Sequence, residues 1–313
     1  MAVREVVPDV DAAGGKRQSG TGRLLVGLVR LARPHQWIKN VLVLAAPAAA
    51  GVLDQREPLL ETAIAFAAFC LAASGTYFLN DAADVVADRA HPDKRHRPVA
   101  AGAVPVVLAQ VLGVVLVAGG VAVGFAAGGV ELPAVVAGYV ALTTAYSFGL
   151  KRVAVVDLVC VAAGFVLRAV AGAVATDVPI SDWFFIVASF GSLFMVAGKR
   201  HAEQLDLGDE ARTIRATLGV YSQSYLHYIR SVSSGTVMVA YCLWAFERPR
   251  EVGGGEIWYE LSIIPFVLGI MHYALRLEQG AGAAPEEIAL RDRSLQVIGV
   301  VWIVLFGLGV HGT

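Results

Sequence analysis

Nine long apolar stretches separated by clusters of charged residues constrain the fold of this 313-residue chain more than any other feature. A helix of about 20 apolar residues crosses the roughly 30 Å hydrocarbon core of a bilayer. The chain is 57% hydrophobic and 16% charged, whereas soluble domains carry about 25% charged residues. The sequence therefore predicts an all-α membrane protein with nine transmembrane helices. The expected spans are 38–55, 59–80, 102–126, 132–149, 153–175, 182–199, 228–246, 258–276 and 294–311.

Lysine and arginine are unevenly distributed between the two ends of these spans. If the N-terminus is cytoplasmic, most of them fall on the cytoplasmic side, and the opposite side holds only Arg56, Arg248 and Arg250. Short loops rich in basic residues stay in the cytoplasm during insertion. The pattern therefore predicts a cytoplasmic N-terminus, an external C-terminus and a location in the plasma membrane.

The polar segments divide the chain into a tail and one membrane domain. Residues 1–20 are polar and Gly-rich without periodicity, which indicates a disordered cytosolic tail. Residues 21–313 form the predicted transmembrane domain, in which residues 21–31 are expected to form an amphipathic helix on the membrane surface. The predicted cytoplasmic loops are 81–101, 149–152 and 200–227.

Acidic and amide side chains gather where the second span ends. On a helix with about 100° between residues, they share one arc of roughly 100° with a tyrosine. These residues are Tyr77, Asn80, Asp81, Asp84 and Asp88. Hard oxygen ligands that leave room for water and a polyphosphate suit Mg²⁺. The alternative is a solvated helix end with ordinary carboxylates, which is disfavoured because acidic residues at membrane depth are costly.

Basic residues follow this acidic face directly. Lys94, Arg95 and Arg97 suit a diphosphate bound beside a metal ion, since Arg grips phosphate with two hydrogen bonds and Lys supplies a point charge. Taken alone, the same run would be an anchor on the positive side of the membrane. His91 and His96 are expected to be loop residues rather than metal ligands.

Four motifs carry a resemblance to a known family. They are RPHQWIKN at 33–40, NDAADVVAD at 80–88, YSFGLKR at 146–152 and GKRHAE at 198–203. Over about Arg33 to Val310, this pattern resembles the UbiA superfamily of intramembrane prenyltransferases. Many members carry a second D-x-x-x-D motif after the sixth span. Here only Glu203 and Asp206 are available at that place, so a second Mg²⁺ site lacks its usual ligands.

The combination of motifs is most similar to the actinobacterial branch of the superfamily that uses 5-phosphoribosyl 1-diphosphate (PRPP) as donor and decaprenyl phosphate as acceptor. The resemblance implies a central cavity open to the cytoplasm and Mg²⁺-dependent transfer of 5-phosphoribose with release of diphosphate. The lipid product would serve synthesis of cell-wall arabinan. The expected partners are PRPP, decaprenyl phosphate and membrane lipids, without nucleic acid; a homo-oligomer is left open.

The resemblance also assigns roles to residues. Mg²⁺ would be held by Asn80 and Asp84, while Asp81 and Asp88 would bind through water, orient neighbours or contact ribose hydroxyls. The residues expected to bind PRPP are Lys39, Tyr77, Lys94, Arg97, Lys199, Arg200 and Glu203. Those expected near the lipid phosphate are Tyr146, Lys151, Arg152 and Arg168. A lipid phosphate is already anionic at neutral pH, so no dedicated general base is expected.

Two of these assignments have structural alternatives. Arg168 lies in the middle of the fifth span, where an unpaired cation is costly, so we expect it to face the cavity and pair with an acid or a phosphate. Its alternative role is to bond helix carbonyls. For Lys151 and Arg152 the alternative is a short loop whose charges only set the topology.

Two other functions remain open at this stage. One is transfer of a prenyl group from a prenyl diphosphate to an aromatic or other acceptor, which favours a complete D-x-x-x-D after the sixth span. The other is a transporter or lipid-binding protein, which favours several deep charges and repeated halves. Neither pattern is present in this sequence.

Overall fold

The computed structural model describes residues 20–91, 93–207, 216–279, 288 and 291–312, and within these ranges every regular element is helical. Six helices there are long and apolar enough to cross a membrane. They are α3 (Arg56–Ala83), α5 (Val106–Gly124) extended by η3 (Phe125–Ala127), α7 (Val156–Ala175), α8 (Asp182–Leu207), α11 (Glu256–Glu278) and α13 (Arg293–His311). The predicted tail lies outside the described residues except for Gly20.

The other three predicted spans are helical but do not belong to these six. The first is divided into a 3-10 helix, η1 (Pro34–Leu44), and a short α2 (Ala45–Ala50). The other two are α6 (Glu131–Phe148) and α10 (Gln223–Val252). The first span is thus broken into two short pieces, and α6 and α10 are not among the helices that are long and apolar enough to cross a membrane.

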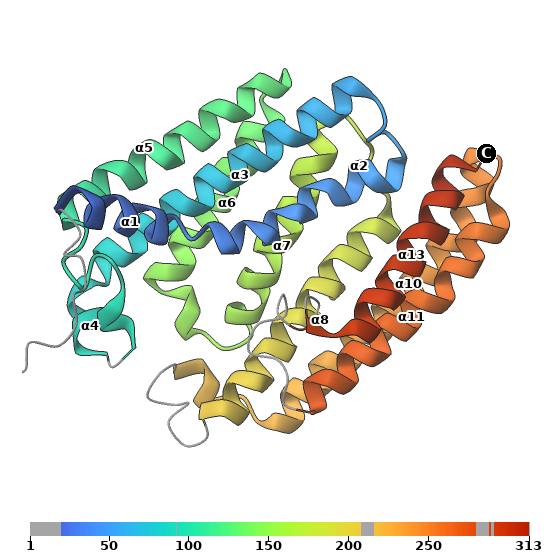
Figure 1. Cartoon of the computed structure of the whole chain (residues 1–313). Coiled ribbons are helices and arrows are strands. Elements are labelled where there is room, and N and C mark those ends of the chain that lie inside the picture. The colour runs from blue at the N-terminus through green and yellow to red at the C-terminus, as the bar shows by residue number, and fades with distance from the viewer. Residues whose placement is uncertain (1–19, 92, 208–215, 280–287, 289–290, 313) are drawn as a thin grey trace, which may run out of the picture.

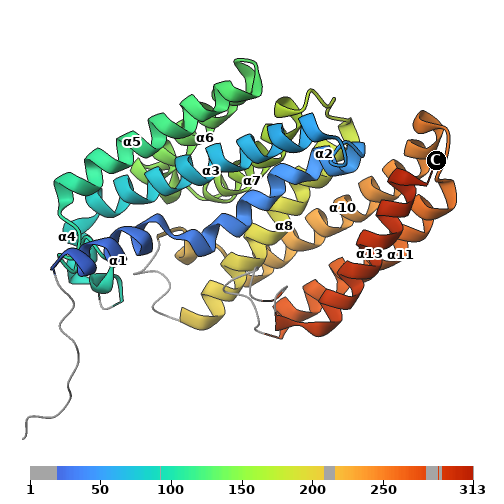
Figure 2. The same cartoon turned by 45° about the horizontal axis from the view of Figure 1, so that its top comes forward.

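The helices form two groups joined by α8. Figure 1 shows α10, α11 and α13 side by side at one edge, and α8 lies between α10 and α7. The predicted surface helix is present as α1 (Gly20–Ala32), which lies beside the α4 end of α3 in both views (Figures 1 and 2). Leu31 of α1 packs against Phe78 and Val99, while Leu25 and Val29 are exposed. The α1 helix therefore packs against the end of α3 that carries the acidic residues.

The main core lies where η1, α3, α6 and α7 meet. Phe69, Tyr139 and Val43 are almost fully buried there. A Cβ atom at Gly172 would collide with the carbonyl oxygen of Val43, so glycine is needed for η1 to approach α7 this closely. Small residues allow the same close backbone approach between helices inside membranes generally.

Two predicted loops contain more helix than expected. The connection 81–101 holds α4 (Val85–Ala90) and the 3-10 turn η2 (Lys94–His96). The connection predicted at 200–227 begins with helix, because α8 continues past the predicted span to Leu207. Its last turns, KRHAEQLDL, are polar but rich in good helix formers, so the helix continues where the apolar run stops. Short 3-10 turns, η4 (Leu150–Arg152) and η6 (Ala216–Gly219), complete the same end.

Candidate active site

The acidic residues of α3 keep an almost helical course into α4, as predicted. The backbone breaks only at Asp84, and the amides of Asp84 and Asp88 still donate to the carbonyls of Asn80 (2.9 Å) and Asp84 (2.8 Å). The four side chains nevertheless differ in burial. Asp81 and Asp88 are buried, Asn80 is half-buried and Asp84 is exposed. The acidic face is therefore divided into a buried pair and a pair open to a ligand.

Two arginines hold the buried pair. Arg33 Nη2 donates to Asp81 Oδ1 at 2.8 Å, and Arg97 Nη1 donates to Asp81 Oδ1 at 3.1 Å and to Asp88 Oδ2 at 2.9 Å. The second oxygen of Asp81, Oδ2, is buried without a hydrogen-bond partner in the described part of the chain. An orphaned buried acceptor is costly, so this oxygen is suited to a hydroxyl donor or a cation.

Arg33 reaches Asp81 through a strained backbone. It joins α1 to η1 in a left-handed conformation (φ 51°, ψ 56°), which costs a residue with a side chain about 1–2 kcal/mol. Its guanidinium also lies 4.7 Å from the ring centre of Tyr77. From sequence alone, Arg33 had no role in the site. Its position directly before Pro34, in a motif shared with the resembled family, was the available signal.

The open pair, Asn80 and Asp84, differs from the buried pair in its contacts. Within the described ranges, the side chains of Asn80 and Asp84 make no hydrogen bond or ion pair. Lys94, on η2, is half-buried and its ammonium is likewise without a partner there. Lys39 bonds Gln36 on η1. Of the predicted donor site, Asn80, Asp84 and Lys94 thus bond no other side chain in the described ranges.

A second cluster surrounds a residue that the sequence did not single out for the site. Asp157, at the start of α7, has an exposed fraction of 0%. Its carboxylate accepts from Tyr146 Oη (2.8 Å) and from Arg200 Nε (3.0 Å) and Nη2 (3.3 Å), and Thr217 Oγ1 lies at 3.4 Å. From sequence alone, Asp157 had no role. Its true partners come from α6, α8 and η6, so only the packing of these elements reveals them.

This cluster changes the interpretation of two predicted binding residues. Arg200 is buried and places every guanidinium nitrogen on a protein acceptor, including Glu203 Oε2 at 3.0 Å from Nη1. Tyr146 gives its hydroxyl proton to Asp157. Both side chains are thus committed to protein partners in this arrangement, and their contacts with substrate phosphates stay predictions. Lys199 and Glu203 are more open, and Lys199 Nζ lies 3.9 Å from Glu203 Oε1.

Arg168 adopts the structural alternative considered for it. Its guanidinium donates to Asn40 Oδ1 (2.7 Å), to the carbonyl oxygen of Gly164 (2.6 Å) and to Tyr139 Oη (3.0 Å). The ring centre of Tyr139 lies 4.6 Å away. Within the described residues Arg168 has no acidic partner, and neutral acceptors bond all three of its nitrogens. Arg168 thus joins η1, α6 and α7, and its contact with the lipid phosphate stays a prediction.

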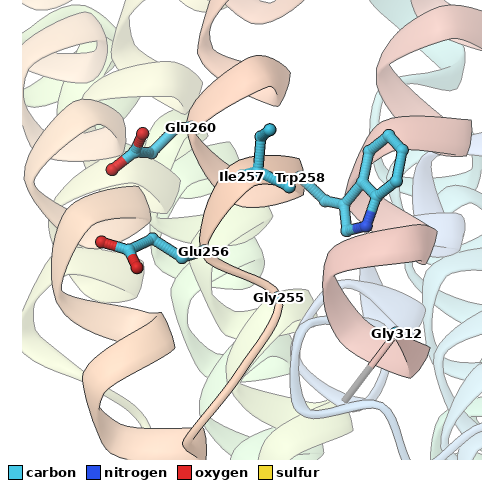
Figure 3. Close-up of a pocket in the computed structure, with 6 residues that line it drawn as sticks. All are labelled: Gly255, Glu256, Ile257, Trp258, Glu260 and Gly312. Carbon is cyan, nitrogen blue, oxygen red and sulfur yellow. The ribbon is translucent and has the colours of Figure 1, made fainter.

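Apart from Arg168 in the middle of α7 and Lys39 on η1, the predicted site residues lie on elements that meet at one end of the helix bundle. Figure 1 shows α4, the connection between α6 and α7, and the last turns of α8 at the same lower end. Lys151 and Arg152 lie in that connection, where Lys151 is half-buried and Arg152 exposed. Two surface hollows lie elsewhere. One is a cavity of about 430 Å³ beside Glu61 and Asp177, and the other is a shallow depression at the start of α11 (Figure 3). Neither adjoins the acidic face.

Comparison with known proteins identifies the family. Residues 41–289 match the UbiA prenyltransferase family. The chain belongs to this family. It is 42% identical to the decaprenyl-phosphate phosphoribosyltransferase of Corynebacterium glutamicum, over 95% of this chain and 90% of that protein. It is 46% identical to the protein of the same name from Mycobacterium tuberculosis, over 92% of this chain and 95% of the relative. The family predicted from the four motifs is confirmed.

The fold has a solved counterpart. A UbiA homolog from Archaeoglobus fulgidus bound to GPP and Mg²⁺ superposes with a TM-score of 0.67, covering 91% of this chain and 99% of that chain. The two sequences are 16% identical, so the similarity concerns the fold. The all-helical UbiA fold expected from the sequence is therefore present.

Proposed function

We propose that this protein transfers 5-phosphoribose from PRPP to decaprenyl phosphate and releases diphosphate. The observation that carries the proposal is the 42–46% identity to decaprenyl-phosphate phosphoribosyltransferases over more than nine tenths of this chain. In this reaction the bond between the anomeric carbon and the diphosphate oxygen breaks, and its electron pair leaves with diphosphate. A phosphate oxygen of the lipid forms the new bond to the anomeric carbon, so no proton has to be removed from the acceptor.

The residues present fit a magnesium ion at the end of α3. Asn80 and Asp84 supply two oxygens that no other described side chain uses, and we assign them as the ligands. No group of three or more His, Cys, Asp or Glu side chains in the described ranges is arranged to hold a metal by itself. That suits Mg²⁺, which commonly takes one or two carboxylates and completes its shell with water and substrate phosphates. When bound, the ion supplies positive charge against the departing diphosphate.

The protein's own residues would hold the two substrates around this point. Lys94 follows the acidic face and is free to take a phosphate oxygen of PRPP, as are Lys39 and Lys199 once they exchange their present partners. Arg97 is already fixed by Asp81 and Asp88 with 29% of its side chain exposed, so its remaining donors lie beside the acidic face. Lys151 and Arg152, from the next connection at this end, would receive the lipid phosphate.

The proposal includes an orientation in the plasma membrane. The polar ends of α3, α6 and α8 lie together at one end (Figure 1), and the basic residues are concentrated in the segments that join there. The positive-inside rule then makes this end cytoplasmic, where PRPP is a soluble metabolite. With the split first span, α6 and α10 counted beside the six apolar helices, nine spans result, and the C-terminus lies outside.

One assay separates the proposed reaction from prenyl transfer, the activity that the family name favours. Purified protein in detergent with Mg²⁺ would receive radiolabelled PRPP with decaprenyl phosphate, or geranyl diphosphate with 4-hydroxybenzoate. We expect label in a chloroform-soluble phosphoribosyl lipid and no prenylated aromatic product. A prenylated product without any phosphoribosyl lipid would disprove the proposed function and support the alternative.

A further inference from the structure

Three elements converge on Asp157 of α7, a fully buried acidic residue that is absent from the roles assigned above. Tyr146 of α6, Arg200 of α8 and Thr217 of η6 all reach its two carboxylate oxygens. The carboxylate and the guanidinium are both nearly inaccessible, with exposed fractions of 0% and 3%. A buried ion pair of this kind gives little net stability compared with well-packed apolar residues, but removing one partner is strongly destabilising. The Asp157–Arg200 ion pair therefore serves to fix the positions of the helices that it joins.

The backbone that delivers Asp157 is itself strained. Val155 has φ 68° and ψ −50°, a conformation that a β-branched residue adopts rarely and at a cost. Its amide donates to Tyr221 Oη at 2.9 Å, which holds the strained turn in place. The start of α7 is therefore held by Tyr221 and by the partners of Asp157 together.

Arg200 in turn fixes the position of Glu203. Its Nε and Nη2 atoms bond Asp157, and its Nη1 atom bonds Glu203 Oε2 at 3.0 Å. Glu203 keeps 23% of its side chain exposed, and Lys199 approaches its other oxygen. Because Arg200 and Lys199 already lie beside the Glu203 carboxylate, this carboxylate is a weaker ligand for a metal ion. The same carboxylate remains a good acceptor for neutral hydroxyl donors.

Building on the proposed function, we propose that Asp157 is a positioning residue that acts through Arg200 on Glu203, and that this half of the site binds the ribose hydroxyls of the donor without a metal ion. The acidic face of α3 would hold the diphosphate through its metal. The Asp157–Arg200–Glu203 chain would hold the sugar. Arg200 would then serve as a fixed positive charge between the carboxylates of Asp157 and Glu203.

The test compares PRPP with inorganic diphosphate, which lacks the ribose. The full-length protein in detergent would be titrated with each compound in the presence of Mn²⁺. Asp157→Asn and Glu203→Gln should weaken PRPP binding by about tenfold or more, the size of one charge-assisted hydrogen bond. Both should leave diphosphate binding and the number of Mn²⁺ ions bound per chain within about twofold of wild type. Lys94→Ala should weaken both compounds.

A double variant separates positioning from folding. Asp157→Asn alone leaves the buried Arg200 with only the partly exposed Glu203 as counter-ion, so the melting temperature of this variant is expected to fall. Asp157→Asn with Arg200→Gln removes both charges and should recover most of that loss. PRPP binding should stay weak, because Glu203 has lost its bond to Arg200. Asp182→Asn, an exposed residue at the opposite end of α8, is the matched control and should change neither property.

Three outcomes would contradict the inference or the proposed function. If the double variant regains wild-type PRPP affinity, Asp157 is purely structural and the inference is wrong. If Glu203→Gln loses a Mn²⁺ ion, or weakens diphosphate as much as PRPP, this half of the site holds a metal and the inference is also wrong. If wild-type protein binds diphosphate but not PRPP, the proposed function fails instead.

Discussion

Asp81 and Asp84 are three residues apart, yet the structure predicts opposite consequences when each is neutralised. Asp81 is buried and bonded to Arg33 and Arg97. Asp84 is exposed and has no side-chain partner in the described ranges. Asp81→Asn should therefore mainly lower stability. Asp84→Asn should mainly lower turnover, because it removes a charged ligand from the proposed Mg²⁺ site.

The magnitudes follow from the contacts. A hydrogen bond to a charged group is worth about 1.5–3 kcal/mol. The two arginines bonded to Asp81 keep 28% and 29% of their side chains exposed and can regain water, so the lower end applies. We expect a loss of about 2–3 kcal/mol, or roughly 4–10 °C in melting temperature. Asp84→Asn should stay within about 0.5 kcal/mol of wild type. Its turnover should fall by more than about a hundredfold, which corresponds to about 3 kcal/mol of lost transition-state stabilisation.

Thermal unfolding followed by tryptophan fluorescence gives the stability, and transfer of radiolabelled phosphoribose to decaprenyl phosphate gives kcat. Both variants would be measured at saturating Mg²⁺, with Glu57→Gln at the other end of α3 as a control. The division of roles would be refuted if Asp84→Asn retained more than about a tenth of wild-type turnover. Equal losses of melting temperature in the two variants would contradict the assignment of Asp81 as the buried partner of the arginines.

Three further predictions concern the substrates, the topology and the core. Lys94→Ala should raise the KM for PRPP more than that for decaprenyl phosphate, and Lys151→Ala should do the reverse; if both variants weaken PRPP alone, Lys151 belongs to the donor site. In a cysteine-free background, Val252→Cys should react with an impermeant maleimide in intact cells, whereas Asp93→Cys should react only after permeabilisation; the opposite result would overturn the orientation. Arg168→Leu should lower the melting temperature, because Asn40 and Tyr139 lose their buried partner at about 0.5–2 kcal/mol each; an unchanged melting temperature would show that these bonds do not stabilise the fold.

Local sequence patterns determined the class of fold and the location of the acidic face. Apolar length alone predicted where helices occur, because a segment surrounded by hydrocarbon must satisfy its backbone hydrogen bonds internally. The helical arc shared by Asn80, Asp84 and Asp88 survived almost unchanged, since i, i+4 geometry depends only on the local helix. The end of α8 could not be read from the apolar run, because hydropathy marks where a membrane segment stops and not where the helix stops.

Tertiary structure alone decided which charges face a ligand and which face each other. Lys94, Arg97, Arg168 and Arg200 look alike as basic residues in sequence, but Arg168 and Arg200 are buried against acceptors that lie 128 and 43 residues away along the chain. The partner of a buried charge is set by which helices pack together, and no local pattern encodes that choice. Asp157 shows the same limit most clearly: it is one acid at the start of an apolar helix until α6, α8 and η6 meet around it.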